Sequence, residues 1–188
     1  MNRKRWLAGG GAVLIAAIVG TVAFAWLSSG DDGGTSAMQR KLQTVSDTVG
    51  FQADVPTFFP TSATRLVLVD SGTGPGSKVG GSLPLIELVY ESDKKFSFKG
   101  QEFPSTLDIF QVLARLNTPQ GERLAVSNAS FEIYRQIVTK DDAGAPLKAT
   151  YTAIGATKTF VIDFTGEQPS DAGIIKMLES MRPVPKTP

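Results

Sequence analysis

The sequence contains no cysteine and no histidine among its 188 residues. Without cysteine the chain forms no disulfide bond and has no thiol for lipid attachment, so a folded domain must rely on a hydrophobic core. Without histidine it lacks the most common general base and the most common metal ligand. Catalytic pairs that contain histidine and zinc sites built from thiolates or imidazoles are therefore excluded. We expect no metal and no cofactor.

A strong charge imbalance is also missing, because 19 basic side chains face 18 acidic ones. Three of the basic residues, Arg3, Lys4 and Arg5, lie at the extreme N-terminus. The rest of the chain therefore has 16 basic and 18 acidic residues, a net charge of −2. A surface that binds nucleic acid normally needs a clustered basic excess. We expect no nucleic-acid partner.

The segment from Trp6 to Leu27 lacks any charged residue. As a helix rising about 1.5 Å per residue it reaches roughly 33 Å, enough to cross a hydrocarbon core of about 30 Å. Tryptophan near each end suits the two membrane interfaces. We therefore predict a short cytoplasmic stub and a transmembrane anchor in residues 1–27. The residues expected to hold the anchor in the bilayer are Arg3, Lys4, Arg5, Trp6 and Trp26.

The charges on either side of this segment predict its orientation. A basic cluster precedes it and Asp31 and Asp32 follow it, which favours a cytoplasmic N-terminus and an extracytoplasmic main body. The protein is thus expected in the plasma membrane with a single span. The alternative is a signal peptide cleaved near Ala25 and a secreted product, because Ala23-Phe24-Ala25 fits a cleavage site. The apolar segment is longer than the usual 7–15 residues or so of a signal peptide, which favours the anchor.

Beyond the anchor we expect a flexible linker in residues 28–36 and one domain in residues 37–188. The linker prediction rests on the composition SSGDDGGTS. The domain opens with a predicted helix from Ala37 to Val49, which Gly50 ends. Its apolar stripe comprises Met38, Leu42, Val45 and Val49. Two prolines make residues 51–60 extended.

Alternation of apolar and polar residues predicts a series of short strands. The expected strands are residues 65–70, 83–91, 95–99, 130–138, 147–153 and 158–165. A turn is predicted at residues 92–94. Residues 105–116 fit either a helix or a strand, and we favour the strand because hairpins surround it. Together these segments indicate an antiparallel sheet with one solvent-facing side.

The chain is expected to close with a helix from Asp171 to Met181, capped by Ser170. Its apolar stripe should cover the sheet. Pro183 and Pro185 should end it and leave a frayed tail. The predicted fold class is therefore α+β: an N-terminal transmembrane helix followed by an antiparallel β-sheet covered by a C-terminal helix.

Several short patterns could carry chemistry, and each has a simpler interpretation. The glycine-rich residues 71–82 lack the spacing of a phosphate-binding loop and indicate a mobile hairpin loop. Ser92 and Lys95 form an S-x-x-K pattern, but the companion motifs of penicillin-binding enzymes are missing. Glu87 and Glu91 lie on one strand face about 13 Å apart, beyond the roughly 5–9.5 Å between glycosidase carboxylates.

The segment KFSFK at residues 95–99 alternates two phenylalanines with lysine and serine. We interpret Phe96 and Phe98 as core residues, with the lysines facing solvent and protecting a strand edge. The alternative is an aromatic ligand platform flanked by lysines.

Four segments together resemble a known type of domain. They are VPTFFP (55–60), LIELVYE (85–91), LDIFQ (107–111) and TKTFVIDFTG with IIKMLESMRP (157–166 and 174–183). This arrangement resembles the uncharacterised extracytoplasmic C-terminal domains of single-pass bacterial membrane proteins of the anti-sigma-factor and sporulation-regulator type. The resemblance implies an α+β extracytoplasmic fold and no particular activity.

The expected function is a non-enzymatic binding module, anchored in the bilayer and facing an unknown envelope protein. It predicts an exposed apolar patch or an unpaired strand edge. One alternative is a carrier of apolar, lipid-like ligands, which needs an empty cavity beneath the C-terminal helix. The other is an envelope hydrolase, which needs two or more carboxylates converging in a cleft.

Overall fold

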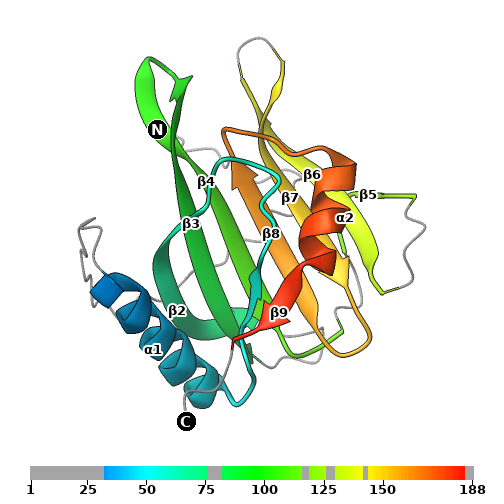
Figure 1. Cartoon of the computed structure of the whole chain (residues 1–188). Helices are drawn as coiled ribbons and strands as arrows, with labels where there is room; N and C mark the ends of the chain where they lie inside the picture. Colours follow the sequence, from blue (N-terminus) through cyan, green and yellow to red (C-terminus); the bar gives the residue numbers. More distant parts are fainter. Residues whose placement is uncertain (1–31, 76–81, 116–118, 126–129, 142–143, 185–188) are drawn as a thin grey trace, which may run out of the picture.

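A computed structural model describes residues 32–75, 82–115, 119–125, 130–141 and 144–184 of the chain. Its elements are α1 (Asp32–Val49), β1 (Asp54–Pro56), β2 (Arg65–Pro75), β3 (Ser82–Phe98), β4 (Gln101–Val112), β5 (Glu122–Arg123), β6 (Glu132–Lys140), β7 (Pro146–Ile154), β8 (Thr159–Thr165), α2 (Asp171–Glu179) and β9 (Met181–Pro183). Seven strands form one antiparallel sheet in the order β2-β3-β4-β8-β7-β6-β5. Both helices lie on the same face of this sheet (Figure 1). The α+β prediction for the folded part is confirmed.

The middle of the sheet joins two hairpin series that are distant in sequence. β4 pairs with β3 on one side and with β8 on the other, and its register places Asp108 opposite Asp163. The preference for a strand over a helix in residues 105–116 is correct, although β4 starts at Gln101 and ends at Val112. The last three predicted strands are present as β6, β7 and β8, and burial alternates along β7 and β8. In β6 only Ile133 is buried, and Ile137, which the alternation places inward, is exposed.

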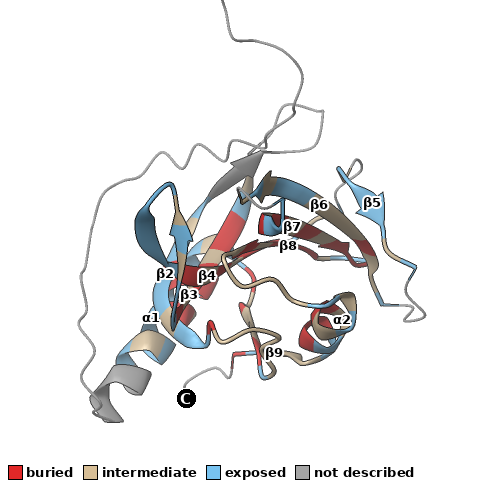
Figure 2. Cartoon of the chain, turned by 90° about the horizontal axis from the view of Figure 1, so that it is seen from above, coloured by how far each residue is buried: buried red, intermediate tan, exposed pale blue. Residues whose placement is uncertain are grey.

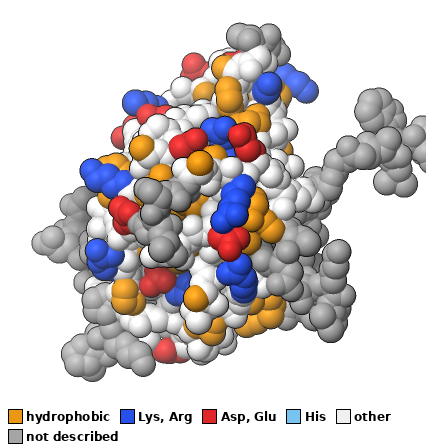
Figure 3. Space-filling view, turned by 90° about the vertical axis from the view of Figure 1, so that its right-hand side faces the viewer, with side chains coloured by type: hydrophobic (Ala, Val, Ile, Leu, Met, Phe, Trp, Pro, Cys, Tyr) orange, Lys and Arg blue, Asp and Glu red, His pale blue; other side chains and the backbone are white. Residues whose placement is uncertain are grey.

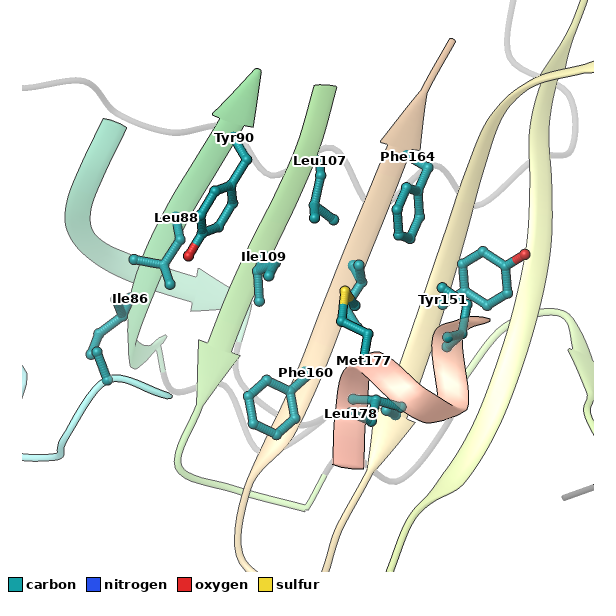
Figure 4. Packing of buried hydrophobic residues seen from close by; sticks show 14 of the residues in the cluster. Ile86, Leu88, Tyr90, Leu107, Ile109, Tyr151, Phe160, Phe164, Met177 and Leu178 are labelled. Carbon is teal, nitrogen blue, oxygen red and sulfur yellow. The ribbon is translucent and has the colours of Figure 1, made fainter. Parts of the chain in front are cut away.

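The main hydrophobic core fills the space between the sheet and the two helices. Figure 4 shows the part of this core that lies between the sheet and α2. α2 contributes Ile174, Met177 and Leu178, and α1 contributes Leu42 and Val45. The hydrophobic sheet residues that are fully excluded from solvent on this face are Val69, Ile86, Leu88, Leu107, Ile109, Ala153, Ile162 and Phe164. The predicted stripe of α1 therefore faces the core, and the C-terminal helix covers the sheet as expected.

The ends of both helices differ from the predictions. α1 begins at Asp32, so the expected linker over residues 28–36 is helical in its second half. Ser170 does cap α2, since its side chain accepts a hydrogen bond from the backbone N–H of Gly173 at 3.1 Å.

α2 ends at Glu179, and Met181–Pro183 form the strand β9, whereas residues 185–188 of the expected tail lie outside the described residues. β9 pairs with β1, with Val55 opposite Arg182. Pro183 is compatible with this position because β9 is an edge strand, where a missing N–H donor is tolerated. The pair closes the open end of the core, and the expected extended stretch 51–60 supplies its partner.

The predicted turn at residues 92–94 is wrong, because β3 continues through it as one strand of 17 residues. The pairing with β4 shifts register between Glu91 and Lys95. Within this irregularity the buried Ser92 hydroxyl accepts a hydrogen bond from the backbone N–H of Lys94 at 2.9 Å. The polar residues that indicate a turn thus form a bulge, because β4 pairs with β3 on both sides of it.

The face of the sheet opposite the helices is not simply solvent-facing. It carries a second, smaller apolar cluster of Leu85, Phe110 and Val112. Seen from above, both helices and β9 lie on one side of the sheet, and buried residues run along β4 and β8 (Figure 2). The prediction of one wet face is therefore only partly correct: polar and apolar groups share this face.

Candidate interaction surfaces

The predicted anchor lies outside the described residues, and so do Arg3, Lys4, Arg5, Trp6 and Trp26. None of the helices within residues 32–184 that the structure describes is long and apolar enough to span a bilayer. The anchor and its orientation therefore stay predictions.

The glycine-rich segment 71–82 connects two paired strands. β2 extends to Pro75 and β3 begins at Ser82, with Gly74 opposite Leu83. The antiparallel hairpin is as predicted, but the strands occupy part of the expected loop. Lys78 and the other residues of 76–81 lie outside the described part of the chain.

A row of carboxylates crosses the face of the sheet opposite the helices. Asp70 on β2 lies opposite Glu87 on β3, and Asp108 on β4 lies opposite Asp163 on β8. Opposite side chains in an antiparallel pair share a face and have Cβ atoms about 4.5–5.5 Å apart. Asp163 accepts a hydrogen bond from the Thr150 hydroxyl at 2.6 Å and forms an ion pair with Lys148 at 2.9 Å.

Asp108 is the most perturbed carboxyl group in this row. Burial, followed by the charges of Asp163 and Glu87, raises its pKa to about 6, against smaller opposing effects of Lys148 and Thr106. Its buried Oδ1 atom has no hydrogen-bond partner among the described residues. Burial also raises the pKa of Glu87, followed by the charge of Asp70. These groups are thus held close together at an energetic cost.

Among the described residues, no group of three or more acidic side chains is placed so that it could hold a metal ion. Glu87 and Glu91 share a face as predicted, but their partners differ. Glu91 forms an ion pair with Arg65 at 3.1 Å, whereas Glu87 lies near Asp70. The expectation that these two glutamates do not act together is therefore consistent with their surroundings.

The serine and the lysine of the S-x-x-K pattern contact different partners. Lys95 lies 3.9 Å from Glu102, whereas the Ser92 hydroxyl lies 2.5 Å from that of Ser62. Ser62 also donates a 2.5 Å hydrogen bond to Glu167. Partial burial raises the pKa of Glu167, but hydrogen bonds from Ser62 and Lys94 outweigh burial and lower it. An ionised carboxylate held by so many donors ties the loop before β2 to the segment after β8.

The two edges of the sheet differ in how they are covered. β2 pairs only with β3, and its other side has no strand partner among the described residues. At the opposite edge, the two-residue β5 pairs with Tyr134 and Arg135 of β6. The rest of β6 extends beyond this short partner. Register shifts occur at Leu66–Leu68 in β2 and at Ile137–Thr139 in β6.

Exposed apolar side chains gather at these two irregular edges. Six large hydrophobic residues are exposed in the described chain, and four of them are Val67, Leu68, Ile137 and Val138. On the side of β5 and β6, hydrophobic side chains lie among charges of both signs (Figure 3). Bulges and charges limit uncontrolled pairing at an edge, yet they leave these apolar groups accessible.

The β3–β4 hairpin contradicts the interpretation of Phe96 and Phe98 as core residues. Neither belongs to the hydrophobic clusters, and both are half-buried. Phe96 stacks on Phe103 with ring centroids 5.7 Å apart, outside the layer that the helices cover. The reason is that β3 continues past the end of its neighbour β2, which the predicted turn does not anticipate.

Comparisons with protein-family models, with curated proteins and with solved structures find no match to this chain. The residues that sequence reasoning misses are Asp108 and Asp163, whose segments show only ordinary alternation. Their proximity depends on the pairing of β4 with β8, for which the sequence contains no local signal.

Proposed function

We propose that this protein is a non-enzymatic binding module, anchored in the plasma membrane by residues 6–27 with its α+β domain outside the cytoplasm. A protein partner contacts the open β2 edge. The observation that carries the proposal is the exposure of Val67 and Leu68 on a strand with no outer partner among the described residues. Exposed apolar groups beside unpaired backbone are typical of a surface that receives another chain.

The filled core and the exposed β2 edge both favour a binding module over a carrier of an apolar ligand. A carrier requires space between α2 and the sheet, but Met177, Ile162 and Phe164 fill this region and are fully buried (Figure 4). By contrast, the β2 edge leaves Val67 and Leu68 more than one third exposed, at 36% and 37%.

The experiment is a crosslinking pull-down from intact membranes with the full-length protein as bait. The Leu68→Lys variant is compared with Leu113→Lys, because Leu113 is also exposed but follows β4 and lies outside the edge strands. We expect a reproducible envelope protein with the unchanged chain and with Leu113→Lys, and its loss with Leu68→Lys. Equal recovery with both variants would refute the β2 surface, and recovery of lipid alone would refute the binding module.

The carboxylate row supports one second candidate, an envelope hydrolase. Asp108, with its pKa raised to about 6, would donate a proton, and Asp163 would act as the ionised partner. The contacts of Asp163 favour a structural role, since Thr150 and Lys148 already occupy its two oxygens. Turnover of an envelope glycan or ester that Asp108→Asn abolishes would establish the hydrolase and displace the binding module.

A further inference from the structure

The β3–β4 hairpin extends beyond the rest of the sheet. β2 accompanies β3 only as far as Glu91, and β8 accompanies β4 only from Thr106. Beyond these limits, towards the turn of the hairpin, β3 and β4 pair only with each other. This two-stranded ribbon runs from Lys95 opposite Pro104 to Phe98 opposite Gln101. Figure 1 shows this ribbon in green, projecting above the sheet.

One face of the ribbon is aromatic. Phe96 and Phe103 lie opposite each other, and Phe98 follows on the same face. Phe103 is 39% exposed although it is stacked on Phe96. The root of the ribbon is fixed, because Gly166, at φ +84, lies against Phe96 and Ser105 where a side chain would clash. The aromatic face is thus held in place and presented to the outside.

The tip carries a lysine in an unfavourable backbone conformation. Lys99 (φ 51) and Gly100 (φ 76) form the two-residue turn, and Lys99 is the one non-glycine residue with positive φ in the described chain. Such a position normally takes glycine, asparagine or aspartate. The Lys99 ammonium lies 5.2 Å from the Phe98 ring centre, and no described carboxylate is within ion-pair distance of it. A lysine in a turn position that normally takes glycine, asparagine or aspartate indicates that the charge of Lys99 has a function.

We propose that this hairpin docks on the anionic phospholipid surface of the membrane that anchors the chain. Its aromatic face enters the headgroup region, and Lys99 contacts lipid phosphates. Burial of apolar side chains together with attraction between lysine and anionic lipid is the general basis of such interfacial binding. Lys94 and Lys95, at the root of the ribbon, face the carboxylates of Glu167 and Glu102, so Lys99 at the tip supplies the positive charge that this surface requires.

The inference rests on the proposed anchor, which makes docking an intramolecular event that a weak contact can sustain. The hairpin tip and the first turn of α1 lie on the same, left-hand side of the molecule in Figure 1. One bilayer plane beside that side would meet both. Docking would fix the orientation of the domain, and with it the direction in which the β2 edge faces.

The experiment uses the absence of cysteine, because a single introduced cysteine then carries a unique environment-sensitive fluorophore. The full chain is reconstituted in phosphatidylcholine vesicles with phosphatidylglycerol and headgroup-labelled quencher lipids. Labels are placed at Gln101→Cys on the aromatic face, at Ser97→Cys on the opposite face, and at Thr157→Cys in the β7–β8 turn. We expect several-fold stronger quenching at position 101 than at position 157, an intermediate value at 97, and weaker quenching at 101 without phosphatidylglycerol.

Lys99→Gly separates lipid contact from turn formation. Glycine suits the positive φ, so the thermal unfolding midpoint should stay the same or rise, whereas quenching at position 101 should fall. Unchanged quenching in this variant would overturn the role of the lysine. Equal quenching at positions 101 and 157 in vesicles that retain the chain would overturn docking.

Alkaline extraction of the same vesicles tests the anchor separately. Release of the chain would overturn the proposed anchor and, with it, the docking that depends on it. A label at 101 that is shielded in native membranes but unquenched in the lipid vesicles would show that a protein covers the hairpin, which also overturns the lipid assignment.

Discussion

Leu107, Ile109 and Phe164 are fully buried beneath the helices, whereas Asp108 and Asp163, adjacent to them on the same strands, belong to the opposite face. The covered face holds apolar side chains in a continuous core. The opposite face combines a cluster of three buried apolar residues with close carboxylates. Successive side chains along a strand thus point to two different faces. One face stabilises the fold, and the other holds carboxylates that lower its stability when ionised.

The largest expected effect comes from the covered face. Phe164→Ala should lower the free energy of unfolding by about 3–5 kcal/mol, because a fully buried ring leaves a cavity. Phe110→Ala on the opposite face is the matched control and should cost less, since that cluster is small and Phe110 is at its margin. Denaturant unfolding of the full chain in detergent measures both. Equal losses would contradict the distinction between the faces.

The next largest effect is a gain in the free energy of unfolding, expected when Asp108 is replaced. Burial and neighbouring acids raise the pKa of Asp108 from 3.8 to about 6, so the folded state binds this proton more tightly than the unfolded state. The group therefore lowers stability as the pH rises from 3.8 through about 6, and its full cost applies above that pH. Asp108→Asn should raise the free energy of unfolding by up to about 3 kcal/mol at neutral pH, since each pKa unit corresponds to about 1.4 kcal/mol.

Unfolding curves across this pH range give the test of the Asp108 prediction. The gain should shrink towards the acid end and vanish below the ordinary pKa of aspartate. Asp163→Asn should gain less, because it weakens the contacts with Lys148 and Thr150. A loss of stability in Asp108→Asn at neutral pH would show that the ionised carboxylate is favourable in the fold.

A smaller effect is expected where α2 joins the covered face. Ser170→Ala removes the hydrogen bond to the Gly173 N–H and should cost about 1 kcal/mol. Ser170→Asp keeps an acceptor at the cap and should remain close to the unchanged protein. Thermal or denaturant unfolding distinguishes the two, and equal losses would mean that the cap does not hold the helix.

The smallest effect on stability is expected at the β2 edge. Leu68 is exposed, so Leu68→Lys should change the free energy of unfolding by no more than about 0.5 kcal/mol. Leu113→Lys should behave alike. A large loss from Leu68→Lys alone would mean that Leu68 supports the fold, and the pull-down with this variant would then report unfolding in place of lost contact.

The elements of the fold follow largely from the sequence, since burial on one face imposes the period of two seen in β7 and β8. The partners of the strands do not. The pairing of β4 with β8 places Asp108 beside Asp163, and nothing local to either segment specifies it. Ser92 to Lys94 has turn composition, but pairing on both sides of it turns these residues into a bulge. The open β2 edge likewise depends on the order of the whole sheet.

The most direct test of the binding proposal is photo-crosslinking in intact membranes from a diazirine amino acid placed at Leu68 or at Leu113. Both positions are exposed, but only Leu68 lies on the open edge of the sheet in the described chain. We expect a discrete adduct with one envelope protein from position 68 and none from position 113. No adduct at position 68, or the same adducts from both positions, would contradict it.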